Sequence, residues 1–86
     1  MMTQREIVSA IVQLAQLDQP YVRAGDLVGP DFHVLVGLVW ALTGQRPDDT
    51  KVCRRLGLVD LLKNHGVRCK VNRDGSVDVD SNKWNG

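Results

Sequence analysis

The chain has 86 residues and a net charge of +1, and its 43% hydrophobic and 24% charged residues are typical of one small folded domain. Its longest apolar stretch, 34–42, is far shorter than the roughly 20 residues of a membrane span, and its N-terminus lacks the pattern of a secretory signal. Two cysteines are too few for a disulfide scaffold, so we expect a reduced, cytoplasmic protein with one globular domain over 1–80 and a short polar tail over 81–86.

The first predicted element is an amphipathic helix over about residues 4–17. Thr3 and Glu6 have the spacing of a capping box, and apolar residues follow them at the helical period. Pro20 and the polar residues before it end this helix. The next segment, 21–28, is short and mixed, and it is compatible with either a brief helix or an extended link.

A second helix is predicted over about twelve residues, between a turn at 29–31 and a stop at Thr43 and Gly44. A buried strand would show a similar β-branched run, but the flanking caps and the length favour a helix. Nearly every side of it is apolar, and such a helix must be covered all round. We therefore expect a central helix wrapped by the others, with a dimer interface as the alternative.

The following loop, 46–50, supplies the N-cap of a third, basic helix over 51–65. The apolar residues of this segment form two stripes that do not share one face of a straight helix. Gly57 lies between the two halves. The pattern is compatible with a kink, or with a break into two short helices at that glycine.

A β-hairpin is predicted at the C-terminus, because apolar and polar residues alternate over 67–72 and again over 77–80. A three-residue loop over 73–75, with Gly75 in the left-handed conformation, places the valines on one face. The resulting cross-strand pairs are Val71 with Val77, Cys69 with Val79, Lys70 with Asp78, and Arg68 with Asp80. We expect this valine face to pack beside Leu56, Val59 and Leu62.

The predicted fold class is therefore α+β: a small, mainly helical domain of about three helices followed by a C-terminal β-hairpin. The order helix, short segment, helix, basic helix and hairpin resembles a winged-helix module. Three short motifs that cover under half of the chain resemble small phage-type winged-helix regulators: Leu42-Thr43-Gly44, Asn64-His65-Gly66-Val67 and Val71-Asn72-Arg73-Asp74-Gly75. The resemblance implies a transcription regulator whose helix enters the DNA major groove while the hairpin contacts phosphates.

Positive charge is concentrated in one part of the chain. Seven of the eleven basic residues lie within 51–73, where Asp60 is the single acid. Such a block is typical of proteins that bind nucleic acid. The predicted contact residues are Lys51, Arg54, Arg55, Lys63 and Arg73, and the first three are expected to project from one helical face. The sequence thus predicts a small nucleic-acid-binding regulator, with DNA the expected ligand.

The alternative is a small protein-binding inhibitor or adaptor, such as a phage or mobile-element protein that acts on a nucleic-acid-handling host complex. Trp40, Phe32 and Tyr21 would then form the interface with a partner protein or a second copy of the chain. Either function involves no membrane.

Neither a metal site nor a catalytic site is predicted. The possible metal ligands Cys53, His65, Cys69 and His33 lack the close cysteine pair of a zinc site. The glycines do not have the spacing of a phosphate-binding loop, and the serines have no evident base beside them. We expect no cofactor and no enzymatic activity.

Overall fold

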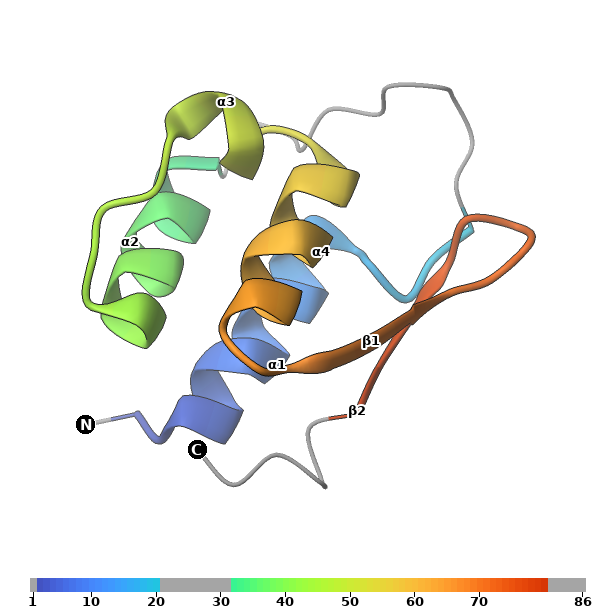
Figure 1. The fold of residues 1–86 in the computed structure, drawn as a ribbon, viewed down its shortest axis with the longest axis horizontal. Helices are drawn as coiled ribbons and strands as arrows, with labels where there is room; N and C mark the ends of the chain where they lie inside the picture. Colours follow the sequence, from blue (N-terminus) through green and yellow to red (C-terminus); the bar gives the residue numbers. More distant parts are fainter. Residues whose placement is uncertain (1, 21–31, 81–86) are drawn as a thin grey trace.

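Four helices followed by a two-stranded antiparallel hairpin form an α+β fold in the computed structural model, which describes residues 2–20 and 32–80 (Figure 1). The helices are α1 (Gln4–Ala15), α2 (Phe32–Thr43), α3 (Asp49–Val52) and α4 (Arg55–Asn64), and the strands are β1 (Arg68–Val71) and β2 (Val77–Asp80). The predicted fold class is confirmed. In Figure 1, α4 lies between α2 and the hairpin, with α1 behind it.

Helix α1 begins at the predicted capping box. The Thr3 amide donates to Glu6 Oε1, and the Glu6 amide donates to Thr3 Oγ1, both at 3.1 Å. The helix ends at Ala15, two residues earlier than predicted, because Gln16 turns left-handed with φ 53°. Beyond the turn, Leu17 is fully buried, and its carbonyl oxygen accepts the Val77 amide at 2.7 Å. The end of α1 is therefore bonded directly to the hairpin.

Helix α2 forms as predicted, but only one side of it is covered. Its inner residues, Leu35 and Val39 among them, are buried against α1 and α3. On the outer side, however, Val34 is 52% exposed and Trp40 is 50% exposed. The prediction of a central helix covered all round is wrong, because the remaining helices pack on one side of α2.

The basic segment forms two helices, but the break is not at Gly57. Helix α3 ends at Val52, and Arg54 takes an extended conformation as the N-cap of α4. Gly57 instead lies inside α4, where a Cβ atom would come within 2.9 Å of the Lys51 Cα. The glycine therefore permits a close approach of the two helices rather than separating them.

The hairpin has the predicted register: all four cross-strand pairs are observed. Gly75 is left-handed (φ 86°), and Asn72 and Ser76 close the loop with a 2.8 Å backbone hydrogen bond. Val77 is buried, whereas Val71 is 43% exposed and Leu56 is 61% exposed. The predicted packing beside Leu56, Val59 and Leu62 is confirmed in part: Val77 shares the core with Val59 and Leu62, and Val71 and Val77 line a surface depression with Leu56, but Val71 stays outside the core.

Fifteen apolar residues from α1, α2, α3, α4 and the hairpin region share a single core within the described part of the chain. None of the helices in the described ranges 2–20 and 32–80 is long and apolar enough to cross a membrane. The predictions for 21–28, for Tyr21 and for the 81–86 tail fall outside the described residues.

Candidate nucleic-acid interface

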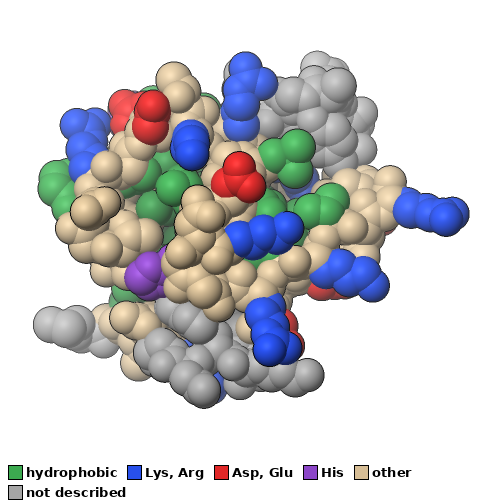
Figure 2. Space-filling view, in the orientation of Figure 1, with side chains coloured by type: hydrophobic (Ala, Val, Ile, Leu, Met, Phe, Trp, Pro, Cys, Tyr) green, Lys and Arg blue, Asp and Glu red, His purple; other side chains and the backbone are tan. Residues whose placement is uncertain are grey.

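Six of the seven basic residues within 51–73 have exposed side chains. They are Lys51, Arg54, Lys63, Arg68, Lys70 and Arg73, and we call them the basic face. Figure 2 shows the side of the molecule on which α3, α4 and the hairpin lie in front of α1, and Lys and Arg side chains are spread across it. The six residues of the basic face thus belong to elements that follow one another in the chain, from α3 to the hairpin.

Arg55 does not belong to this face. Its side chain is only 7% exposed. Its Nη2 atom donates to three backbone carbonyls: Leu17 at 2.8 Å, Gln19 at 2.6 Å and Gly75 at 3.4 Å. The prediction that Lys51, Arg54 and Arg55 project from one helical face is wrong, since Arg55 turns inward to hold the end of α1 and the hairpin loop together.

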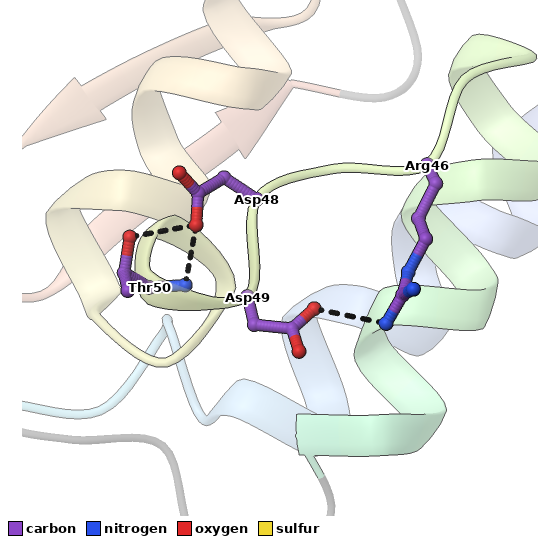
Figure 3. Close-up of polar contacts among 4 residues, drawn as sticks. All are labelled: Arg46, Asp48, Asp49 and Thr50. Atoms are coloured by element: carbon purple, nitrogen blue, oxygen red, sulfur yellow. Dashed lines mark hydrogen bonds and ion pairs between the residues drawn. The ribbon is translucent and has the colours of Figure 1, made fainter.

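The corner between α3 and α4 fixes the positions of Lys51 and Arg54. Asp48 caps α3 by accepting hydrogen bonds from the Thr50 amide at 2.9 Å and the Thr50 hydroxyl at 2.8 Å (Figure 3). The hydroxyl and then the amide of Thr50 lower the pKa of Asp48. Because the Asp48 carboxylate is charged at neutral pH, it holds the N-terminus of α3 in place at that pH. The Arg54 amide then donates to the Lys51 carbonyl at 3.3 Å, which closes the corner.

A second acidic residue before α4 is paired locally. Arg46 Nη2 lies 3.4 Å from Asp49 Oδ1, and both side chains are about half exposed or more (Figure 3). Exposed pairs of this kind contribute little to stability. The pairing nevertheless partly neutralises the negative charge of Asp49, which lies two residues before Lys51 in the chain.

The hairpin loop that carries Arg73 is held by its own polar groups. Asp74 Oδ1 accepts hydrogen bonds from the Ser76 hydroxyl at 2.6 Å and the Ser76 amide at 2.9 Å. These bonds, the hydroxyl first, lower the pKa of Asp74. Asn72 Nδ2 donates to Ser76 Oγ at 3.0 Å and to Asp78 Oδ2 at 3.2 Å. The loop is therefore ordered before any ligand binds, and it presents Arg73 at its tip.

The strand residues Arg68 and Lys70 were not among the predicted contacts, and the predicted register pairs them with the acids Asp80 and Asp78. The register places them opposite those acids, yet both basic side chains are exposed. The alternation of apolar and polar residues along the strand indicated that both side chains are exposed, because it turns them away from the core.

The outer side of α4 is not a simple basic surface. Leu56, Asp60 and Lys63 follow one another at helical spacing, and all three are exposed. Asp60 is an acid among bases and would repel a phosphate. Helix α4 therefore offers one cation, one anion, one aliphatic side chain and, at its last residue, the amide of Asn64 to a ligand. The other cations come from α3, Arg54 and the hairpin.

A small apolar depression of about 150 Å³ lies between the start of α4 and the hairpin. It is lined by Arg55, Leu56, Val71, Gly75 and Val77. The exposed residues Arg54 and Lys70 are direct sequence neighbours of this lining, and the exposed Arg73 lies two residues from both Val71 and Gly75. This apolar feature was missed from the sequence, because Leu56 and Val71 were both assigned to the core.

The described residues provide no group of three His, Cys, Asp or Glu side chains that could hold a metal ion. Both cysteines are free and half-buried. Burial raises the pKa of the Cys69 thiol, whereas the nearby Lys63 lowers it to a smaller extent. A raised pKa leaves the thiol protonated and poorly reactive at neutral pH.

A second cavity, of about 370 Å³, is formed by residues near the C-terminal ends of α2 and α4 and by the loop that follows α2, Arg46 among them. No family model, no curated protein and no solved structure matches this chain. The function is therefore argued from the basic face and its surroundings.

Proposed function

We propose that this protein is a small, non-enzymatic regulator that binds duplex DNA through the basic face. The observation that carries the proposal is the exposure of six cations on consecutive elements, from Lys51 in α3 to Arg73 in the hairpin loop. Nucleic-acid phosphates are the polyanion that such a surface fits, and contacts to them supply most of the affinity of weakly specific binding.

The order of α2, α3, α4 and hairpin supports a docking mode of winged-helix type. Helix α4 would face the major groove, and Arg73 at the hairpin tip would lie on the neighbouring phosphates. Lys51 and Arg54 at the α3–α4 corner would contact the backbone on the other side of α4. Arg55 acts only through the scaffold, by fixing the hairpin loop to the end of α1.

Low sequence specificity is expected of this surface. Base edges are read chiefly by Arg, Lys, Asn and Gln in the groove, and of the exposed residues of α4 only Lys63 and Asn64, at its C-terminal end, are of these types. Phosphate contacts position a protein but carry no sequence information directly. We therefore expect modest affinity that depends strongly on salt and little on base sequence.

The experiment that tests the proposal is a mobility shift with a random duplex at low salt. The double variant Lys51→Glu with Arg54→Glu should lose binding, whereas Arg5→Glu, an exposed arginine on α1, serves as the control and should retain it. Circular dichroism should show all variants folded. Equal binding by the double variant and the control would refute the proposal.

The apolar depression favours a second candidate function, the docking of a protein partner. An acidic segment that inserts one aliphatic side chain beside Leu56 and Val71 would match both the depression and the cations near it. Leu56→Ser separates the two functions, since it removes the apolar contact but none of the charges. DNA binding should survive this change, whereas docking of an acidic protein should not.

A further inference from the structure

The outer side of α2 is an apolar helix face that nothing in the described structure covers. Its exposed residues recur at helical spacing: His33, Val34, Gly37, Trp40 and Ala41. We call these five residues the outer α2 face. Val34 and Trp40, its two largest apolar side chains, are each about half exposed, at 52% and 50%. No Lys, Arg, Asp or Glu occurs anywhere in α2.

Gly37, at the centre of the outer α2 face, has no evident role in the folding of the domain. Within the described residues, no atom lies within 4 Å of a Cβ atom built at this position, so packing would admit a larger residue. A glycine inside a helix costs about 1 kcal/mol relative to alanine. Glycine is favoured where another backbone approaches closely, and here that approach can come only from outside the described fold.

The arrangement of the outer α2 face is symmetric about Gly37. Val34 and Trp40 lie three residues to either side of it, and His33 and Ala41 lie four residues to either side. A two-fold axis through Gly37 therefore brings an antiparallel copy of α2 into register. Val34 then packs on Trp40 of the second copy, and the two glycines allow the helices to come close.

We propose that the occupant of this face is a second copy of the chain, paired through antiparallel α2 helices. In a two-fold interface, a charged residue near the axis faces the same charge on the second copy and is repelled by it. A face without Lys, Arg, Asp or Glu therefore suits self-association better than the charged surfaces elsewhere on the molecule. In Figure 1, α4 lies between α2 and the hairpin, so the pairing leaves the hairpin accessible. The inference does not depend on DNA binding.

The size of the face indicates a weak dimer. A tryptophan buries at most about 250 Å², and half of Trp40 is already covered in the monomer. The five residues together therefore offer less than the roughly 800 Å² per partner of a standard stable interface. We expect monomers at low micromolar concentration and dimers as the concentration approaches the millimolar range.

Sedimentation velocity from about 10 µM to about 1 mM tests this inference directly. The wild-type mass should rise toward twice the monomer mass of 9.6 kDa as the concentration increases. Val34→Asp and Trp40→Lys should each remain monomeric and folded, because each places a charge against an apolar partner residue. Leu56→Asp is the matched control, because Leu56 is an apolar residue on α4 that is at least as exposed, and this variant should dimerise like the wild type.

Mixing the two monomeric variants tests the pairing itself. In a mixed dimer the substituted positions 34 and 40 face each other with opposite charges, while the other Val34–Trp40 contact is intact. If dimers form in the mixture but in neither variant by itself, the antiparallel arrangement is established. A wild type that stays monomeric at about 1 mM, variants that dimerise normally, or a mixture without recovery would each overturn the inference.

Discussion

The guanidinium of Arg55 donates a 2.8 Å hydrogen bond to the carbonyl of Leu17, the same oxygen that accepts the Val77 amide at 2.7 Å. One backbone carbonyl thus joins the end of α1, the first residue of α4 and the start of β2. The contact explains why a basic residue in the middle of the basic block is buried. It also fixes the position of the hairpin relative to α4, on which the proposed docking mode depends.

Replacing Arg55 with Met should destabilise the protein by about 3 kcal/mol. The change removes three donated hydrogen bonds and leaves the buried Leu17 carbonyl with one partner fewer, and hydrogen bonds to charged groups contribute about 1.5–3 kcal/mol. Urea denaturation measures the loss. Arg54→Met is the control at the neighbouring exposed position, and its effect should stay within about 0.5 kcal/mol. Equal stabilities would contradict the structural role of Arg55.

Two glycine-to-alanine changes should have opposite effects on stability. Gly57→Ala places a methyl group 2.8 Å from the Lys51 carbonyl carbon, so we expect a loss of about 1–3 kcal/mol from overpacking. Gly37→Ala meets open space and should gain about 0.5–1 kcal/mol, because alanine favours the helix. Thermal unfolding at low protein concentration, where dimers are absent, measures both. A destabilising Gly37→Ala would show that α2 packs differently.

Stability should fall in acid, because three exposed carboxylates have lowered pKa values. The causes are the Thr3 amide at Glu6, the Thr50 hydroxyl at Asp48 and the Ser76 hydroxyl at Asp74. Their stabilisation is fully present above the ordinary pKa values of 4.5 for Glu and 3.8 for Asp, and it is lost as the pH falls through the lowered values.

Denaturant midpoints between about pH 6 and pH 2 measure this acid dependence. The triple variant Glu6→Gln, Asp48→Asn and Asp74→Asn keeps acceptors at all three positions but cannot titrate there. Its midpoint should change less with pH than that of the wild type. An identical pH profile in the two proteins would show that other groups govern the acid sensitivity.

Asp60→Asn should tighten DNA binding several-fold. Asp60 is exposed on α4 between Leu56 and Lys63, so its carboxylate lies on the side proposed to face phosphates. Removing one repelling charge strengthens attraction to a polyanion, and the gain should shrink as salt rises. Fluorescence anisotropy with a labelled duplex measures it. Asp18→Asn, an exposed acid just after α1, is the control and should have little effect.

Features set by neighbouring residues could be predicted from the sequence. The Thr3–Glu6 capping box, the N-cap supplied by the 46–50 loop and the hairpin register each depend on residues a few positions apart or on the period of a strand. The predicted helix order depends on the same kind of local pattern.

The orientation of Arg55 and Leu56 could not be predicted in this way. The carbonyls that hold Arg55 belong to residues 38, 36 and 20 positions away, which no local pattern reveals. Because α4 begins at Arg55 and not at Lys51, the helix faces are rotated relative to the prediction. Arg55 therefore turns inward and Leu56 outward, which changed the candidate site by one cation and one apolar residue.

The salt dependence of duplex binding is the most direct test of the basic face. Five to six phosphate contacts predict a slope of log affinity against log salt of about −4.5 to −5.4, and Lys51→Glu with Arg54→Glu should make it shallower by about 2. Anisotropy titrations at several salt concentrations give both slopes. A wild-type slope near zero, or a slope unchanged in the double variant, would contradict DNA binding through these residues.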